Sequence, residues 1–211
     1  MKPERVYCVG LHMGDGSLGI NRPSKTTRER SPNAKSKWYV NFSSTDLELC
    51  ELYKSIMGVK NKILVSEDNR KESYKTYYRI NTHDKRLVQG FQIIGFGERK
   101  SVDWKKLMLY IKGSEAEFLR GYLDTDGTVT HNTTQYWVDW ATCDSVVAKG
   151  VSELLLKEGI SSSIYKKECS GYRTLYTVRV RDLVHLYRFL YRLDLGVETR
   201  KQRLMKSFIK A

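Results

Sequence analysis

Two aspartates stand at the same position in two segments of nearly the same sequence. Residues 8–17 read CVGLHMGDGS and residues 119–128 read LRGYLDTDGT. In each segment a glycine is third, and an Asp-Gly pair that begins at Asp15 or at Asp126 is eighth and ninth. A repeat reveals architecture before any single element can be assigned. The two aspartates are therefore expected to occupy equivalent places in two related halves.

The residues before each aspartate predict a short helix, over 6–14 in the first segment and 115–125 in the second, broken by the glycine after the aspartate. Small residues recur four positions apart on both helices, a spacing that lets two helices approach until their backbones nearly touch. These small residues are Gly10, Gly14, Gly121 and Thr125. If the two helices pack together in this way, Asp15 and Asp126 lie side by side at the C-terminal ends.

A pair of carboxylates at two helix ends favours a bound cation. The carboxylates of Asp15 and Asp126 would repel each other, and each would meet the negative end of a helix dipole. Ligation by oxygen alone suits Mg²⁺, or Mn²⁺ in its place, because magnesium accepts one or two carboxylates and keeps water or phosphate oxygens as its other ligands.

The elements that must position the aspartates also repeat. Each acidic segment is followed by a first hairpin, whose second strand shows apolar alternation, and by a helix with an Asp cap. A second hairpin and a closing helix that leads into a basic segment complete each half. Each half therefore reads αββαββα, which predicts an α+β fold built by pseudo-two-fold duplication. The predicted boundaries are 1–100 for the first repeat, 101–113 for a linker and 114–211 for the second repeat. The strands and helices are expected over 38–42, 46–57, 62–67, 75–81 and 84–92, and over 136–140, 144–158, 163–168, 173–180 and 182–193.

Composition limits the class of protein. The chain has 211 residues of which 40% are hydrophobic, enough for a proper core, and no apolar run approaches the roughly 20 residues that span a bilayer. The basic N-terminus lacks the apolar stretch of a signal peptide, so a cytoplasmic, nucleoid or organellar location is expected, neither secreted nor at a membrane. The four cysteines are scattered without a C-x-x-C spacing, which predicts reduced core residues rather than a zinc site or disulfides.

The net charge of +13 makes polyanions the natural partners. Basic residues crowd the first long hairpin loop, and strand alternation turns a mixture of aromatic, polar and basic side chains away from the core, where they could touch bases and phosphates. A merely solvated sheet face is the alternative for any one of them. The predicted DNA contacts are Arg22, Lys25, Arg28, Arg30, Lys35, Lys37, Tyr39, Asn41, Tyr77, Arg79, Trp137, Asp139, Arg173, Thr177 and Arg179.

Both acidic segments resemble the LAGLIDADG motif of homing endonucleases, whose pattern has glycine third, an acid eighth and glycine ninth. The order of elements is similar to that of the single-chain, two-repeat members, in which two saddle-shaped antiparallel sheets with helices on the outer face straddle DNA. One departure is Met13, which stands where the pattern has an earlier aspartate. The second repeat keeps this acid as Asp124, and a capping or supporting role is expected for it.

The resemblance implies site residues. Asp15 and Asp126 would bind the divalent metal, and the backbone carbonyls of Gly14 and Thr125 would add ligands. A basic residue after the last helix of each repeat would serve each site in catalysis. Lys100 and Lys201 match best, with Arg99 and Arg200 as alternatives.

The implied function is a site-specific, double-strand DNA endonuclease, encoded in a mobile intron, that leaves short 3′ overhangs at a long asymmetric target. The implied state is a monomer, with intron RNA as a second candidate partner. One alternative is an RNA maturase or a cleavage-inactive nucleic-acid-binding protein of the same family. A remote alternative is a phosphatase with a DxDGT signature at residues 124–128, in which Asp124 would be the nucleophile at the end of a strand. The helix predicted over 115–125 counts against that alternative.

Overall fold

The computed structural model describes residues 2–31, 33–68, 75–98, 100–133, 135–168, 173–196 and 198–210, without the side chains of Arg28, Asp68 and Lys75. The chain forms two compact units. Unit 1 comprises the residues up to Gly14 together with those from Ile111 onward, and unit 2 comprises Asp15–Tyr110. The N-terminal helix is thus counted with the second half of the sequence. The repeat boundaries at residues 100 and 114 concern the sequence and stay a prediction.

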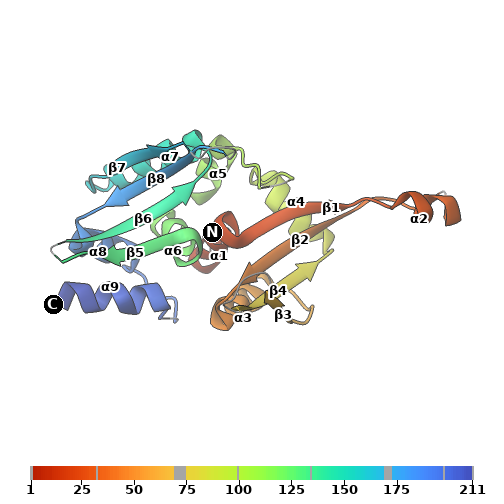
Figure 1. Ribbon diagram of the computed structural model, residues 1–211, viewed down its shortest axis with the longest axis horizontal. Coiled ribbons are helices and arrows are strands. Elements are labelled where there is room, and N and C mark those ends of the chain that lie inside the picture. Colours follow the sequence, from red (N-terminus) through yellow and green to blue (C-terminus); the bar gives the residue numbers. More distant parts are fainter. Residues whose placement is uncertain are drawn as a thin grey trace. The chain divides into compact units, whose positions relative to one another are not determined.

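Unit 2 holds a four-stranded antiparallel sheet of order β1-β2-β4-β3, with α3 and α4 packed against its central strands (Figure 1). Two helices in this half were not expected. The first, α2, lies inside the predicted hairpin loop, where the Ser24 hydroxyl accepts a hydrogen bond from the Thr27 N–H. The second, α5, lies within the predicted linker. The elements are β1 (Gly16–Asn21), α2 (Lys25–Arg30), β2 (Lys37–Ser44), α3 (Leu47–Met57), β3 (Leu64–Asp68), β4 (Lys75–Thr82), α4 (Lys85–Ile93) and α5 (Trp104–Ile111).

Unit 1 holds a second four-stranded antiparallel sheet, of order β5-β6-β8-β7. This order corresponds strand by strand to that of the first sheet, so the predicted α+β class and the αββαββα order of both halves are confirmed. The closing helix ends at Leu190, earlier than predicted, and α9 is an additional helix. The elements are α1 (Pro3–Asp15), α6 (Glu115–Asp126), β5 (Gly127–His131), β6 (Tyr136–Thr142), α7 (Ser145–Lys157), β7 (Ser163–Lys167), β8 (Leu175–Val180), α8 (Leu183–Leu190) and α9 (Arg200–Lys210).

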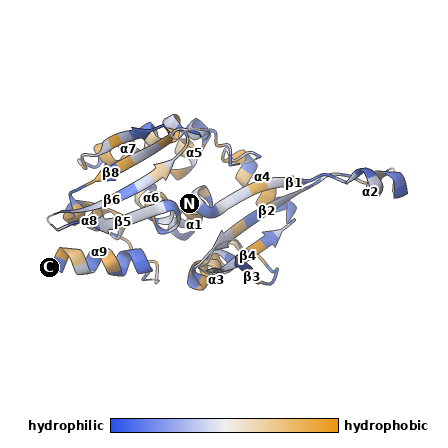
Figure 2. Cartoon of the chain, in the orientation of Figure 1, coloured by the Kyte–Doolittle hydropathy of each residue, from blue (hydrophilic) through white to orange (hydrophobic). Residues whose placement is uncertain are grey.

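Strand alternation places the core as predicted. Val40 and Phe42 are buried, and the Phe42 ring stacks on Tyr53 of α3 with centroids 4.3 Å apart. Trp140 is buried in the second sheet, and its indole N–H donates to the Leu119 carbonyl of α6 at 3.3 Å. Hydrophilic and hydrophobic residues follow one another along β8 (Figure 2). Each sheet therefore buries one face under helices and leaves the other face partly exposed.

Aspartate caps start the helices that follow the first strand pair in each half. The Asp46 carboxylate accepts from the Glu48 N–H at 3.2 Å, and the Asp144 carboxylate accepts from the Val146 N–H at 2.8 Å. Gly58 and Gly159, just past the ends of α3 and α7, have φ of 69° and 73°, a region that favours glycine. The predicted helix signals are therefore confirmed in both halves.

The cysteines follow the prediction only in part. Cys8 and Cys50 are buried, and burial raises the pKa of the Cys50 thiol to about 12. Cys143 is exposed, so its predicted core position is wrong; it lies in the turn between β6 and α7. Cys169 lies outside the described residues. Across the described ranges, no helix combines the length and the apolar composition needed to cross a membrane.

Candidate active site

Helices α1 and α6 meet backbone to backbone inside unit 1. A Cβ atom placed on Gly10 would lie 2.1 Å from the Phe118 carbonyl oxygen, and one placed on Gly121 would lie 2.1 Å from the Tyr7 carbonyl oxygen. No side chain fits at such distances, so both positions require glycine. The close approach predicted from the small residues is confirmed.

The same contact continues to the C-terminal end of α6. A Cβ on Gly14 would lie 2.1 Å from the Thr125 hydroxyl oxygen. The residues that follow are the two candidate metal ligands, Asp15 as the last residue of α1 and Asp126 as the last residue of α6. Asp126 is exposed, and Asp15 is half-buried and belongs to unit 2. Their pairing around a metal stays a prediction.

Lys201 supplies a cation at the end of α6. Its side chain comes from the first turn of α9, and Nζ donates to the carbonyl oxygens of Leu123 at 2.6 Å and Thr125 at 2.8 Å. A cation at a helix C-terminus is stabilised by the helix dipole and by the last carbonyls. The structure therefore brings the predicted lysine to the residue before Asp126. The Thr125 carbonyl, a predicted metal ligand, accepts this hydrogen bond, and its role as a ligand stays a prediction. The alternative, Arg200, is exposed.

Lys100 lies in a different setting in unit 2. It is exposed and has φ of 62°, a left-handed conformation that is unfavourable for a residue other than glycine. Backbone hydrogen bonds close the turn around it, from the Gly97 N–H to the Ser101 carbonyl at 2.8 Å and from the Ser101 N–H to the Glu98 carbonyl at 3.3 Å. Its predicted catalytic role stays a prediction, and the alternative Arg99 lies outside the described residues.

Asp124 is buried two residues before Asp126. Only 6% of the residue is exposed, and its carboxylate accepts from the Tyr7 hydroxyl at 2.9 Å and from the Thr199 hydroxyl at 2.7 Å. Burial raises the pKa of the Asp124 carboxyl, and the hydrogen bonds from Thr199 and Tyr7 oppose that increase. Because Asp124 lies within a helix, unlike a phosphatase nucleophile at a strand end, the DxDGT alternative loses its structural basis.

Arg120 is a second buried polar residue of α6, and the sequence reasoning missed it. It is 2% exposed, and its guanidinium carbon lies 5.4 Å from the Tyr7 ring centroid and 4.7 Å from that of Tyr191. Its N–H groups donate to the Leu193 carbonyl and the Gln202 side chain, both at 3.2 Å. Arg120 therefore ties α6 both to the segment after α8 and to α9. The signal in the sequence that could have indicated its role is a basic residue on an apolar face of the predicted helix.

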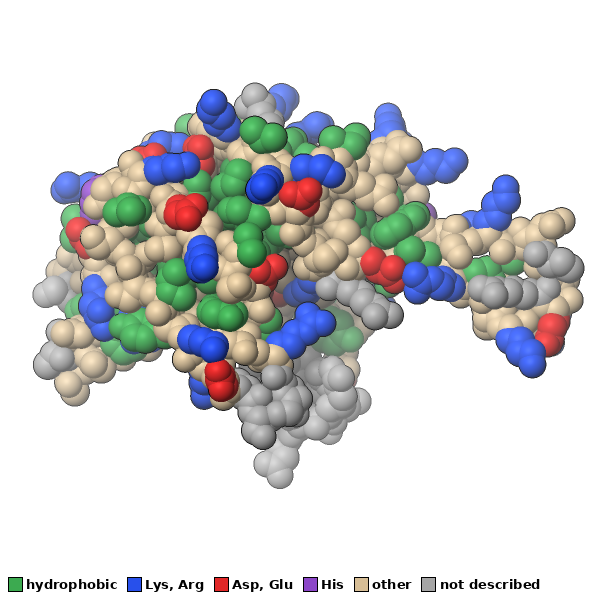
Figure 3. Space-filling view, turned by 90° about the horizontal axis from the view of Figure 1, so that it is seen from above, with side chains coloured by type: hydrophobic (Ala, Val, Ile, Leu, Met, Phe, Trp, Pro, Cys, Tyr) green, Lys and Arg blue, Asp and Glu red, His purple; other side chains and the backbone are tan. Residues whose placement is uncertain are grey.

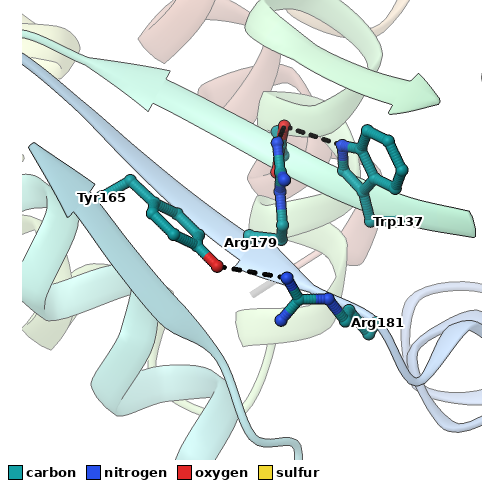
Figure 4. A network of polar contacts seen from close by, with 5 residues as sticks. Trp137, Tyr165, Arg179 and Arg181 are labelled. Atoms are coloured by element: carbon teal, nitrogen blue, oxygen red, sulfur yellow. Dashed lines mark hydrogen bonds and ion pairs between the residues drawn. The ribbon is translucent and has the colours of Figure 1, made fainter. Parts of the chain in front are cut away.

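The partly exposed face of the second sheet carries a stacked ion pair (Figure 4). Asp139 of β6 and Arg179 of β8 are partners in register, joined by hydrogen bonds of 2.8 and 2.7 Å. The Arg179 guanidinium carbon lies 4.5 Å from the Trp137 ring centroid and 5.2 Å from that of Tyr165, and the Trp137 N–H donates to Asp139 at 3.1 Å. The hydrogen bond to Asp139 raises the pKa of Arg179.

Three predicted DNA contacts are thus brought together, with Asp139 and Arg179 bound to each other. Two residues that the sequence reasoning missed join them, because the Arg181 guanidinium donates to the Tyr165 hydroxyl at 3.2 Å and lowers the pKa of Tyr165 (Figure 4). Two further predicted contacts lie along the same half, half-buried Thr177 in β8 and exposed Arg173 just before it. We name the cluster of Trp137, Asp139, Tyr165, Arg179 and Arg181 the arginine face.

The corresponding positions of the first sheet are uncharged. Asn41 of β2 faces Asn81 of β4 in register, where the second sheet has Asp139 and Arg179. Within the described part of the chain, neither Asn41 Oδ1 nor Asn81 Oδ1 has a hydrogen-bond partner. The predicted contacts Tyr39, Tyr77 and Arg79 are half-buried on the same sheet. The two sheets thus offer different chemistry at equivalent places.

The hairpin of β1 and β2 carries the basic residues predicted for its loop. It projects from unit 2 with α2 at its tip (Figure 1), and Lys and Arg side chains lie along it (Figure 3). Arg22 is exposed and pairs with Glu98 at 3.0 Å, while the Arg28 side chain lies outside the described residues. The other predicted contacts of this hairpin, all exposed, are Lys25, Arg30, Lys35 and Lys37.

Comparison with known proteins identifies part of the chain. Residues 113–194 match the family model of the LAGLIDADG-like domain. This chain contains a LAGLIDADG-like domain. The match covers α6, the second sheet and α8, and the resemblance predicted from the repeated segments is confirmed. No curated protein matches the chain.

Solved structures, one of them of a LAGLIDADG homing endonuclease, share the fold over nearly the whole chain. I-DmoI in complex with DNA and Ca is 14% identical, with a TM-score of 0.64 and 97% of each chain covered. The I-LtrWI LAGLIDADG homing endonuclease bound to target DNA is 10% identical, with a TM-score of 0.64, covering 99% of this chain and 89% of that one. I-SmaMI bound to an uncleaved DNA target with calcium is 12% identical, with a TM-score of 0.59 and coverages of 100% and 90%. At these identities the likeness establishes the fold.

Proposed function

We propose that this chain is a LAGLIDADG homing endonuclease that cuts both strands of a specific DNA duplex with a divalent metal. The observation that carries the proposal is the Lys201 ammonium at the C-terminal end of α6, bonded to the carbonyl of the residue before Asp126. Structures of the same fold support it, since I-DmoI is solved with DNA and Ca or Mn, and I-LtrWI with its target DNA.

The oxygen atoms at this end of α6 are suitable ligands for a hard cation. Asp126 presents an exposed carboxylate, and the neighbouring groups are backbone carbonyls. Among the described residues, no three His, Cys, Asp or Glu side chains are close enough to share a metal, so a zinc-type ligand set has no support. Mg²⁺ or Mn²⁺ needs only one or two carboxylates. The proposed ligands are Asp15 and Asp126, with the carbonyls of Gly14 and Thr125.

The protein residues have separate tasks in the proposed reaction. When bound, a divalent metal activates a water nucleophile and neutralises charge on the phosphate. Asp126 holds the reacting groups at the end of α6, and Lys201 stabilises the negative charge that grows on the phosphate in the transition state. Asp15 and Lys100 serve the second strand. Two displacements at offset phosphates leave short 3′ overhangs.

The surfaces described above fit a long and asymmetric DNA target. The projecting basic hairpin would contact phosphates, which fixes position without reading sequence. The arginine face and the neutral Asn41 and Asn81 pair offer different hydrogen-bonding groups to bases. A target read by both sheets would therefore be asymmetric, and one monomer would suffice to bind it.

A cleavage assay tests the proposed function. A plasmid library with randomised target sites is incubated with the full chain in magnesium and in EDTA. We expect a discrete double-strand break in magnesium alone, and DNA affinity that falls as salt is added. Tight binding without breakage in any divalent metal would contradict the endonuclease and favour an RNA maturase or an inactive DNA-binding protein.

Asp139→Ala is expected to alter specificity through Arg179. The substitution removes a negative charge and the two hydrogen bonds that orient the guanidinium. Binding to random duplex should tighten. The slope of log affinity against log salt concentration should steepen by about one unit, as expected for one more phosphate contact, and discrimination between target and random DNA should fall. Fluorescence anisotropy at several salt concentrations measures all three. Glu158→Ala removes an exposed acid at the C-terminal end of α7 and is the control. Equal effects of the two substitutions would contradict the role of Asp139.

A further inference from the structure

Asp124 and Lys201 are connected through one threonine. We propose that the hydrogen bond between Asp124 and Thr199 is a positioning device that fixes the start of α9 and thereby places Lys201 at the end of α6. It serves the site of the second repeat alone. The inference rests on the proposed function, which gives Lys201 a role in cleavage, and it adds two positioning residues and an asymmetry between the two strands.

Thr199 is the cap of α9. Its carbonyl accepts from the Arg203 N–H at 3.0 Å, and its hydroxyl oxygen accepts from the Gln202 N–H at 3.2 Å. The hydroxyl proton is donated to Asp124 Oδ1 at 2.7 Å. A threonine hydroxyl has one proton, so this donation orients its oxygen towards the helix amides. The buried carboxylate thus determines where α9 begins.

Lys201 projects from the first turn that this cap establishes. Its Nζ must cross to α6 to reach the carbonyls of Leu123 and Thr125. The carboxylate of Asp124 and the carbonyls that hold Lys201 therefore belong to the same last turn of α6. A shift at the start of α9 would move the ammonium away from that turn. Misplacement of a catalytic group by about 1 Å can reduce a rate about a hundredfold.

The first repeat has no equivalent acid. Met13 stands where the second repeat has Asp124, and a thioether is only a weak acceptor. Lys100 lies in a turn closed by backbone hydrogen bonds rather than in the first turn of a helix. A variant that disconnects Asp124 from Thr199 should therefore slow the cutting of one strand selectively.

Two buried substitutions separate positioning from general stability. Thr199→Val and Tyr7→Phe each remove one hydroxyl bonded to the same carboxylate, but only Thr199 caps α9. We expect Thr199→Val to slow the cutting of one strand about tenfold or more. Plasmid that is nicked only in the other strand should therefore accumulate. Tyr7→Phe should leave the two strands cut at equal rates. Thr199→Ser should restore balanced cutting, because it restores the hydroxyl.

A double variant tests whether the effect acts through the lysine. Lys201→Met should itself slow one strand, and Thr199→Val should add nothing in that background. If the two substitutions reduce the rate independently, the positioning role is wrong.

Amide hydrogen exchange gives a readout that does not depend on cleavage. Thr199→Val should speed exchange at Gln202 and Arg203, whereas Tyr7→Phe should not. If wild-type protein cuts no DNA, the proposed function fails while this exchange still decides whether the pair holds α9. If wild-type protein cuts DNA but Thr199→Val and Tyr7→Phe behave alike in both assays, the function stands and the positioning inference is overturned.

Discussion

Asp126→Asn is expected to abolish double-strand cleavage while leaving DNA affinity nearly unchanged. The amide keeps the size of the side chain but removes the charge, and it is a poor substitute for a carboxylate as a ligand of Mg²⁺. Without the charge of the metal, the transition state loses several kcal/mol of stabilisation. The cleavage rate should therefore fall about a thousandfold. Asp126 is exposed, so the fold should tolerate the change.

Cleavage and binding must be measured on the same preparations. Plasmid cleavage under single-turnover conditions gives the rate, and anisotropy in Ca²⁺ gives the affinity. Asp144→Asn is the matched control, because it makes the same change at an exposed helix cap of unit 1, where asparagine caps as well as aspartate. A cleavage rate close to wild type for Asp126→Asn, or a parallel loss of cleavage and affinity, would count against the metal role.

Asp124 and Asp126 have opposite environments on one helix. Two residues correspond to about 200° of rotation, so neighbours at this spacing point to opposite sides of a helix. Asp124 consequently faces the packed interior of unit 1, and Asp126 faces solvent. Helix periodicity therefore accounts for the different exposure of the two acids, and the structure shows the hydrogen-bond partners of Asp124.

The predicted elements were those specified by nearby residues. Asp46 and Asp144 cap their helices, Gly58 ends one, and alternation in β2 and β6 separates core from surface, because each signal acts within a few residues. The duplicated sheet order followed from the repeat. The glycine contact of α1 with α6 was also predictable, since steric fit at small residues needs no knowledge of the rest of the chain.

Contacts between distant residues were beyond the sequence. Asp124 binds Tyr7 of α1 and Thr199 before α9, and no local pattern relates these three positions. Asp139 and Arg179 could be assigned to one sheet face, but their pairing depends on the register of β6 with β8. Helix α2 was missed because a short capped turn has little hydrophobic pattern. Lys201 was preferred over Arg200 from the sequence, but its hydrogen bonds to the end of α6 depend on where α9 packs and could not be predicted.

Gly121→Ala should be among the most destabilising single substitutions in the chain. The new methyl group would lie 2.1 Å from the Tyr7 carbonyl oxygen and 2.8 Å from the Leu11 nitrogen, both backbone atoms that cannot rotate away. Helices α1 and α6 would have to separate, and overpacking of this kind lowers the free energy of unfolding by about 3 kcal/mol. Urea denaturation followed by circular dichroism measures the loss.

Gly90→Ala is the control for this substitution. Gly90 is an exposed residue of α4, and a Cβ there meets nothing within 4 Å. Alanine is favoured over glycine in a helix by up to about 1 kcal/mol, so this variant should be as stable as wild type or more stable. Changes of opposite sign in the free energy of unfolding would establish that backbone contact, not helix propensity, determines the effect of alanine at residue 121. A Gly121→Ala variant as stable as wild type would mean that α1 and α6 do not touch, and the end of α6 could then not be held against Gly14 as the proposed site requires.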